Sequence, residues 1–308
     1  MSEVQISAKA VAELRKQTGC GMMDCKKALT DSNGDFEAAI KILREKGMAA
    51  VAKKADRIAA EGIVDILTIG NTTAMVEVNS ETDFVAKNAT FQEFVKNVLK
   101  TIIVNKPADV AALMECNCEG EEGTVTDALG SKTGTIGEKL SIRRFVILEG
   151  AVATYIHNKG ETGVVITFDT DLADNAEFAE CGKNVALQVA AMPVKYLNKE
   201  SVPASVLEEE KAILISQMKN DPKMAGKPEQ VLAKIVEGKV GKYYENNCLL
   251  EQAYVKDDSL TVAKYVASVA KELGGNITVT GFVRFDKGEG IEKREEDFAA
   301  EIAKMVNG

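Results

Sequence analysis

Residues 77–88 read EVNSETDFVAKN, and the unit to which they belong occurs twice in the chain. Downstream of them, a shift of 87 positions superimposes identical residues: Asn88-Ala89 on Asn175-Ala176, Phe91 on Phe178, Glu93 on Glu180, and Lys96-Asn97-Val98 on Lys183-Asn184-Val185. Upstream, Glu61-Gly62 matches Glu149-Gly150 at a shift of 88, so one residue is inserted between the two matches. These matches predict an internal repeat of one structural unit.

The Asp83-Phe84 pair is absent from the second copy, where Thr170-Asp171 stands instead. A fold that both copies share does not require an Asp-Phe pair, so we expect the pair to serve another purpose. It lies between a predicted strand and a predicted helix, and connections are where proteins often place functional side chains. The alternative is structural: Phe84 would cover the core and Asp83 would cap the helix.

Length and composition limit the class of protein. The chain has 308 residues, of which 45% are apolar and 28% charged, and this suits two or more domains with hydrophobic cores. No apolar run reaches the length of a membrane span, and residues 1–4 lack the basic flank and apolar segment of a signal peptide. We therefore expect a cytoplasmic protein without membrane contact.

The net charge is −9, and an acidic chain repels phosphate backbones, so direct nucleic-acid binding is not expected. Residues 1–60 hold more basic than acidic side chains, which suits an acidic protein partner. The six cysteines form no CxxC pair, and Cys116-x-Cys118 is too tight for an ordinary zinc site. Reduced thiols are therefore expected.

Hydrophobic spacing predicts an α+β fold that begins with a helical head. Ser7 can cap a first helix, Met22–Leu29 forms a second, and Asp35 opens a third that ends at Gly47. Residues 51–60 are rich in Ala and Lys and predict a helical linker.

Two strand-turn-strand-helix units are predicted after the linker. The first contains strands at Gly62–Ile69 and Thr73–Asn79, a turn at Gly70-Asn71 and a helix at Ala89–Ile103. The second contains strands at Ala151–Ile156 and Gly163–Phe168, a turn at Asn158-Lys159-Gly160 and a helix at Asn175–Met192. A further strand is predicted at Ser141–Leu148.

Residues 199–246 predict an antiparallel helical hairpin, with Pro203 and Pro228 at the two helix starts. Its helices carry facing apolar stripes: Val206, Leu207, Ile213, Leu214 and Met218 on one, and Leu232, Ile235, Val236, Val240 and Tyr243 on the other. The chain then predicts a helix at Val262–Leu273, a strand at Asn276–Phe285, a turn at Gly288-Glu289-Gly290 and a final acidic helix at Glu295–Met305.

Side chains suited to chemical catalysis are few. His157 is the only histidine and flanks a predicted turn, where a surface histidine is the plain interpretation and a contact or catalytic role the alternative. Residues 130–134, GSKTG, depart from the phosphate-loop pattern and are predicted to form a turn. Neither a cofactor nor enzyme activity is expected. A thiol enzyme using Cys20 or Cys25 is the remaining enzymatic alternative, and it requires a lowered thiol pKa.

Two long stretches carry a family resemblance. Residues 14–29, LRKQTGCGMMDCKKAL, and residues 77–87, EVNSETDFVAK, are similar to two signatures of the translation elongation factor Ts family. Later landmarks are similar as well: Ile142-Arg143-Arg144, Leu148-Glu149-Gly150, Val236-Glu237-Gly238, Gly281–Phe285 and Gly288–Lys293. The resemblance covers essentially the whole chain.

The resemblance implies a guanine-nucleotide exchange factor for elongation factor Tu, which it would meet in GDP-bound and nucleotide-free form. It also implies a ubiquitin-associated-like three-helix head, a two-part core of antiparallel sheets with packed helices, an inserted helical hairpin and a C-terminal helix. Thr82, Asp83, Phe84 and Val85 would displace the Mg²⁺ site of the GTPase. The other implied partner contacts are Arg15, Met22, Met23 and Lys26 in the head, and Ile136, Gly137 and His157 in the core.

Met22 and Met23 stand in succession, so a short helix cannot bury both on one face, and we expect at least one to be exposed. The alternative is that both fill an irregular core.

The expected domains are a head at 1–50, a first repeat at 51–140, a second at 141–198, the hairpin at 199–246 and a core completion with the C-terminal helix at 247–308. The outer surface of the hairpin is a candidate contact for a second copy of the chain. The alternative function is a ubiquitin-associated-like adaptor that binds another protein through residues 1–50 without exchange activity.

Overall fold

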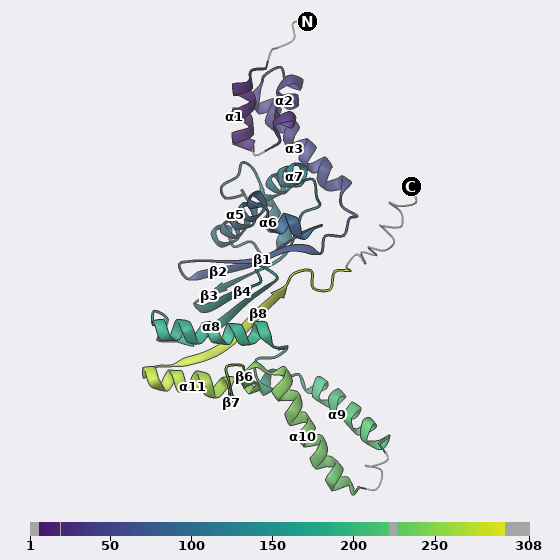
Figure 1. Cartoon of the computed structure of the whole chain (residues 1–308), viewed down its shortest axis with the longest axis vertical. Helices are drawn as coiled ribbons and strands as arrows, with labels where there is room; N and C mark the ends of the chain where they lie inside the picture. The colour runs from purple at the N-terminus through teal and green to yellow at the C-terminus, as the bar shows by residue number, and fades with distance from the viewer. Residues whose placement is uncertain (1–5, 19, 222–226, 293–308) are drawn as a thin grey trace. The chain divides into compact units, whose positions relative to one another are not determined.

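The computed structural model describes residues 6–18, 20–221 and 227–292, which fall into two compact units (Figure 1). The first unit is built from Met1–Ile147, Asn158–Thr162 and Phe285–Gly308, and the second from Leu148–His157 and Gly163–Arg284. Helices combine with small sheets in both units, which confirms the predicted α+β class. The predicted helix at Glu295–Met305 lies outside the described residues.

Three helices form the head of the first unit: α1 (Ala8–Thr18), α2 (Met22–Asp31) and α3 (Phe36–Lys53). The predicted caps are present, because Ser7 Oγ accepts from Ala10 N at 3.1 Å and Asp35 Oδ1 accepts from Ala38 N at 3.1 Å. Leu14 and Leu29 are fully buried in the small core between the helices.

The prediction that the third helix ends at Gly47 is wrong. Helix α3 continues to Lys53, and Gly47 is buried where α3 packs on α7 (Val125–Ile136). A Cβ atom at Gly47 would lie 2.8 Å from the backbone carbon of Gly130, so this glycine permits close helix packing. Residues 54–60 are then turns and extended chain, so only the first part of the predicted helical linker is helical.

The first sheet has the order β1-β2-β3 and is made by β1 (Glu61–Ile69), β2 (Thr72–Ser80) and β3 (Ser141–Glu149). Strands β1 and β2 form the predicted antiparallel hairpin, with Glu61 opposite Ser80 and Gly70 in the turn at φ +60°. The predicted helix is also present as α5 (Ala89–Asn105), whose apolar face is buried in the core that it shares with this sheet.

Two helices between α5 and β3 were not predicted: α6 (Val110–Glu115) and α7. The predicted turn at residues 130–134 is wrong, because these residues lie inside α7. Thr124 caps α7 in a capping box with Asp127, and Lys132 is buried in an ion pair with Glu121 at 2.8 Å. Of the two glycines in this segment, Gly130 lies at the close contact with α3.

The second sheet has the order β4-β5-β8, formed by β4 (Ala151–His157), β5 (Thr162–Thr170) and β8 (Ile277–Asp286). Helices α8 (Ala176–Ala191) and α11 (Val262–Leu273) lie beside it and share its core, as Figure 1 shows. The short strands β6 (Ala253–Tyr254) and β7 (Asp257–Thr261) pair antiparallel in the same unit.

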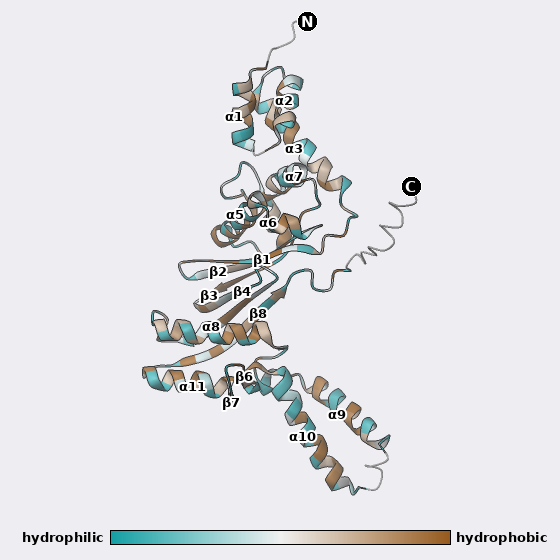
Figure 2. Cartoon of the chain, viewed as in Figure 1, coloured by the Kyte–Doolittle hydropathy of each residue, from teal (hydrophilic) through white to brown (hydrophobic). Residues whose placement is uncertain are grey.

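The predicted hairpin is present as α9 (Ala204–Lys219) and α10 (Glu229–Asn247), which extend away from the second sheet (Figure 1). Apolar residues recur along both helices in Figure 2, and the buried ones are Leu214, Met218, Val236 and Val240. Three members of the predicted stripes lie outside this cluster: Val206, the exposed Ile213, and Tyr243, in whose place Tyr244 packs. Among the described residues, none of the helices combines the length and apolarity needed to cross a membrane.

Candidate partner-binding site

Residues 80–85, which we call the contact loop, run from the last residue of β2 into the short helix α4 (Asp83–Ala86). Thr82 is the N-cap residue, and Val85 points inward, where it is 6% exposed in the core of the first unit. Phe84 points outward and is 77% exposed, the largest fraction among the large apolar side chains of the described residues. The structural alternative for Phe84 is therefore wrong, because this ring does not cover the core.

Glu138 holds the contact loop from the other side. Its Oε2 accepts hydrogen bonds from Glu81 N at 3.1 Å and Thr82 N at 2.9 Å, and its Oε1 accepts one from Thr82 Oγ1 at 2.6 Å. Ser80 Oγ in turn donates to Thr82 O at 3.0 Å. The backbone directly before Phe84 is thus fixed by several bonds although the ring itself is free.

Phe84 and Ile136 meet at a shallow hollow, whose lining is Phe84, Val85, Asn88, Thr90, Thr135 and Ile136. Ile136 is the last residue of α7, and Gly137 ends that helix in the left-handed conformation at φ +88°. The structure therefore brings together two predicted contact residues, Phe84 and Ile136, that are 52 residues apart in the sequence.

Asp83 is exposed, and its carboxylate accepts a hydrogen bond from Lys87 Nζ at 2.7 Å. This bond holds the pKa of Asp83 below its ordinary value. The same ammonium lies 5.7 Å from the centre of the Phe84 ring. Asp83 therefore pairs with Lys87 on the surface, and Thr82 occupies the N-cap position that the structural alternative gave to Asp83.

The predicted head contacts are all on the surface. Arg15 lies in the last turn of α1, while Met22, Met23 and Lys26 lie on α2, and all four are exposed. Met22 is 55% exposed and Met23 73%, so the prediction that at least one of them is exposed is confirmed. The first turns of α2 thus present the apolar Met22 and Met23 and the basic Lys26 to solvent.

His157 is exposed at the end of β4 and belongs to the second unit, whereas the contact loop belongs to the first. Its Nδ1 lies 3.1 Å from the Tyr155 hydroxyl, and this is the polar contact that the ring makes.

The thiol-enzyme alternative is wrong for Cys25, because it required a lowered thiol pKa. Cys25 is fully buried, and desolvation raises its pKa. Cys20 is also buried, with its sulfur 3.3 Å from Ser131 Oγ. All six cysteines are free, and no cluster of metal-binding side chains occurs among the residues that the structure describes.

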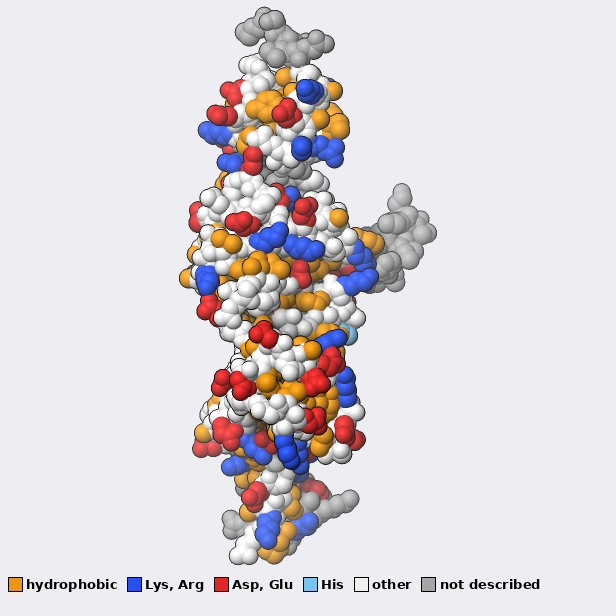
Figure 3. Space-filling model, turned by 90° about the vertical axis from the view of Figure 1, so that its left-hand side faces the viewer, with side chains coloured by type: hydrophobic (Ala, Val, Ile, Leu, Met, Phe, Trp, Pro, Cys, Tyr) orange, Lys and Arg blue, Asp and Glu red, His pale blue; other side chains and the backbone are white. Residues whose placement is uncertain are grey.

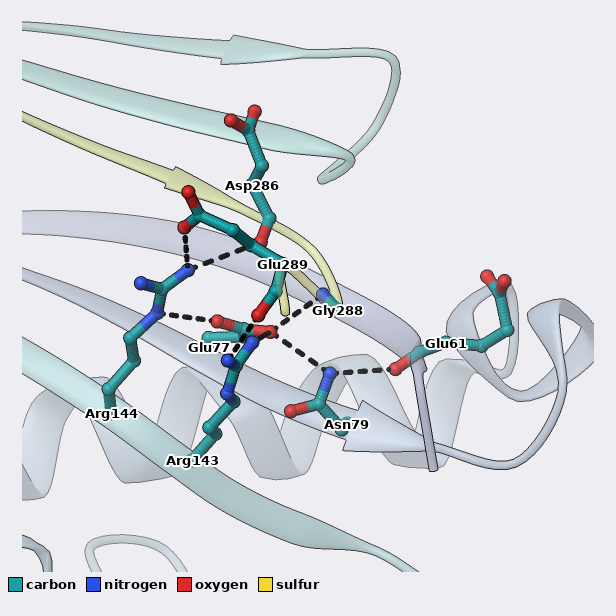
Figure 4. Close-up of polar contacts among 8 residues, drawn as sticks. All are labelled: Glu61, Glu77, Asn79, Arg143, Arg144, Asp286, Gly288 and Glu289. Atoms are coloured by element: carbon teal, nitrogen blue, oxygen red, sulfur yellow. Dashed lines mark hydrogen bonds and ion pairs between the residues drawn. The ribbon is translucent and has the colours of Figure 1, made fainter. Parts of the chain in front are cut away.

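A buried ionic network lies directly before the contact loop, on β2 (Figure 4). Glu77 is fully buried, and its Oε1 accepts from Arg143 Nη1 at 3.0 Å and from Gly288 N at 2.8 Å. Its Oε2 accepts from Arg144 Nε at 2.6 Å. Arg144 also binds the Glu289 carboxylate at 3.0 Å, so the network ties the 286–289 segment to β2 and β3.

Burial acts to raise the pKa of Glu77, but the hydrogen bonds from Gly288, Asn79, Arg144 and Arg143 outweigh it and lower the pKa. A buried carboxylate with this many charged and neutral donors stays ionised. The sequence contained the members of this network only as separate landmarks of the resemblance. A charged residue within an otherwise apolar strand was the available signal, because such a residue needs a partner.

Acidic and basic side chains are interspersed on the face of the molecule in Figure 3, with apolar side chains between them. An apolar ring presented on a fixed, mainly polar surface is typical of the anchor of a protein–protein contact. An exposed ring on a fixed backbone is typical of the class of proteins that bind another protein.

Comparison with known proteins agrees with this class. The family model for elongation factor Ts matches residues 81–289. The chain is 48% identical over 306 residues to elongation factor Ts of Syntrophotalea carbinolica, covering 98% of this chain and 100% of that protein. It is 47% identical to elongation factor Ts of Clostridioides difficile and 46% identical to that of Clostridium kluyveri, covering 98% of this chain and 99% of each relative. The chain belongs to the elongation factor Ts family.

Proposed function

We propose that this chain is the guanine-nucleotide exchange factor of elongation factor Tu, and that it promotes GDP release during protein synthesis. The observation that carries the proposal is the contact loop: in a chain of this family, Phe84 is 77% exposed on a backbone that Glu138 fixes. Exchange is a change in binding, so the chain needs no cofactor and catalyses no chemical reaction. A cytoplasmic location follows from this role.

The contact loop acts on the magnesium and phosphate site of the GTPase in this proposal. Phe84 enters an apolar pocket of the partner, and burying such a ring contributes roughly 1.5–3 kcal/mol, the size of an interface hot spot. Asp83 brings a carboxylate beside Mg²⁺, which proteins hold with few ligands. Loss of the cation leaves the phosphates without its charge, and GDP dissociates faster.

Thermodynamic linkage predicts how GDP affects binding of the chain to elongation factor Tu. If the chain weakens GDP binding to elongation factor Tu, GDP weakens binding of the chain by the same factor. The chain therefore binds both the GDP-bound and the nucleotide-free partner, and binds the nucleotide-free form more tightly.

The head supplies a second contact with the nucleotide domain of the partner, through Arg15, Met22, Met23 and Lys26. Flexible thioethers suit an adaptable apolar surface, and both methionines are exposed. Replacing Met22 and Met23 by Gln should weaken association by about ten-fold and leave the melting temperature unchanged. Unchanged affinity of that double variant would remove the head from the contact surface.

Ile136, Gly137 and His157 complete the proposed contacts. Ile136 is supported by its place beside Phe84, whereas His157 is supported only by exposure. We also interpret the head as ubiquitin-associated-like and the two sheet-and-helix units as copies of one ancestral unit.

The hairpin is proposed as the contact for a second copy of the chain. Ile213 and Ile215 on α9 and Val231 on α10 are exposed, each by more than 40%. Replacing the two isoleucines by Lys should shift the sedimentation of any dimer to the monomer value; an unchanged sedimentation profile would contradict this role.

The decisive experiment mixes the chain with elongation factor Tu loaded with fluorescent GDP and follows release into excess unlabelled GDP. Release should accelerate with the concentration of the chain. Equilibrium dialysis of the chain alone should show no tight GDP binding. A chain that neither binds the GTPase nor accelerates release would instead favour the alternative, an adaptor for another protein.

A further inference from the structure

We propose that Glu138 is a positioning residue for nucleotide exchange, because it sets the place from which Phe84 meets the partner. The inference rests on the proposed function. Phe84 itself has too little packing to fix its position, so the position must come from the backbone on either side of it. Val85, the residue after Phe84, is anchored in the core. Glu138 fixes the backbone of Glu81 and Thr82, the two residues before Asp83.

Two glutamates form a reciprocal bond pattern between the contact loop and the end of α7. The Glu138 carboxylate accepts from the backbone N–H groups of Glu81 and Thr82. The Glu81 carboxylate accepts from the backbone N–H of Lys139 at 2.6 Å. Each segment thus provides a carboxylate that accepts hydrogen bonds from backbone N–H groups of the other. Hydrogen bonds to an ionised acceptor are stronger than those between neutral groups.

A third segment joins this pattern. Lys139 Nζ donates to Ala55 O at 2.5 Å and to Arg57 O at 2.8 Å, both in the connection that follows α3. Arg57 Nη1 in turn forms an ion pair with Glu81 Oε1 at 3.1 Å. The junction therefore holds the chain leaving the head, the contact loop and the end of α7 against one another.

Such a junction is useful for a side chain that must enter a partner in one orientation. Preorganisation lowers the entropy lost on binding. A mutation remote from a site that misplaces its groups by about 1 Å can slow a reaction by roughly a hundred-fold. Glu138 is half-buried and does not take part in the apolar core, so its removal should displace the loop without unfolding the unit.

The first test measures GDP release from elongation factor Tu with Glu138→Ala, Glu138→Gln and the control Glu93→Ala, an exposed glutamate on α5. We expect Glu138→Ala to slow exchange by about ten-fold. Glu138→Gln keeps an acceptor for the backbone and should stay within about three-fold of the parent, while Glu93→Ala should match it. Equal losses in the Ala and Gln variants would overturn the assignment.

A double-mutant cycle with Phe84→Ala separates positioning from a general structural effect. If Glu138 acts through Phe84, adding Glu138→Ala to Phe84→Ala should slow exchange by less than about two-fold more. A full additional ten-fold loss would show that Glu138 acts elsewhere, and the proposal would fail.

The second test does not depend on exchange. The chain has no tryptophan, so Phe84→Trp introduces one fluorophore at the tip of the contact loop. Adding Glu138→Ala to that variant should lower the fluorescence anisotropy of the indole, and adding Glu93→Ala should not. Unchanged anisotropy would overturn the positioning role, whereas a chain with the expected anisotropy change but no exchange activity would overturn only the proposed function.

Discussion

Helices α5 and α8 begin with the same N-cap, but the loops that precede them present different side chains. Asn88 Oδ1 accepts from Thr90 N at 2.8 Å and Phe91 N at 3.4 Å. Asn175 Oδ1 accepts in the same way from Glu177 N at 2.8 Å and Phe178 N at 3.2 Å. The helix start is therefore the same local structure in both units.

The residues before these caps behave differently. In the contact loop, Phe84 points outward while Glu138 holds the backbone. In the second loop, Asp171 Oδ1 accepts from Asn276 N at 2.7 Å, and Leu172 packs against the core of its unit. One loop is bonded so that an apolar ring stays free, and the other is bonded to its own sheet. The two loops therefore differ, although the helices that follow them begin with the same cap.

The largest expected effect comes from giving the contact loop the residue of the second loop. Phe84→Asp removes the exposed ring, and losing an interface anchor worth roughly 2 kcal/mol or more slows exchange by about ten- to a hundred-fold. Stability should change by less than about 0.5 kcal/mol, because the ring is exposed. Fluorescent GDP release and chemical denaturation measure the two quantities. Exchange at the parent rate would rule out intrusion of Phe84.

The reciprocal change, Asp171→Phe, should have the opposite profile. It removes the acceptor for Asn276 N, and loss of a hydrogen bond to a charged group costs about 1–2 kcal/mol of the free energy of unfolding. Exchange should stay at the parent rate, since this loop is not part of the proposed contact. Loss of exchange in a folded Asp171→Phe variant would add the loop before α8 to the proposed contact surface.

The shared caps should respond alike. Asn88→Ala and Asn175→Ala should each lower the free energy of unfolding by about 1 kcal/mol, because each helix loses the acceptor for two backbone N–H groups. Ser at either position retains a cap and should recover most of the loss. A difference between the two Ala variants much larger than this value would show that the helix starts are not equivalent.

The smallest expected effect concerns the ion pair at the edge of the contact loop. The hydrogen bond from Lys87 holds the pKa of Asp83 below 3.8, so the folded protein binds this proton less tightly than the unfolded chain. The pair therefore stabilises the protein above pH 3.8, and this contribution is lost as the pH falls through the folded pKa.

An NMR titration of Asp83 in the parent and in Lys87→Ala measures the effect. The pKa should rise toward its ordinary value in the variant, and the stability of the two proteins should converge in acid. A pKa that does not move would mean that Lys87 does not act on Asp83 in solution.

The sequence by itself determined the elements whose causes are local. Asn88 and Asp35 cap helices through their own side chains, and Gly70 supplies the φ of +60° that the β1–β2 turn needs. Alternation and helical spacing then placed the strands and the long helices, because an apolar face must be buried wherever the chain goes. Exposure of a methionine in the Met22-Met23 pair followed from the same geometry.

Tertiary structure determined the backbone conformation wherever contacts between distant residues outweigh the local conformational preference. Residues 130–134 are helical because Gly130 meets Gly47 and because Glu121 pairs with the buried Lys132. The same contact between Gly47 and Gly130 accompanies the continuation of α3 beyond Gly47 to Lys53. Local glycine preferences predicted a turn and a stop there, and packing outweighed them.

The site shows the same division between local and distant causes. The Asp83-Phe84 pair could be singled out by comparing the two matching stretches of sequence, but the residues that support its backbone could not be predicted. Glu138 reaches Thr82 across 56 residues, and Glu77 reaches Gly288 across 211. No periodicity or spacing encodes which backbone N–H a distant carboxylate will accept from, because that choice exists only once the chain has folded.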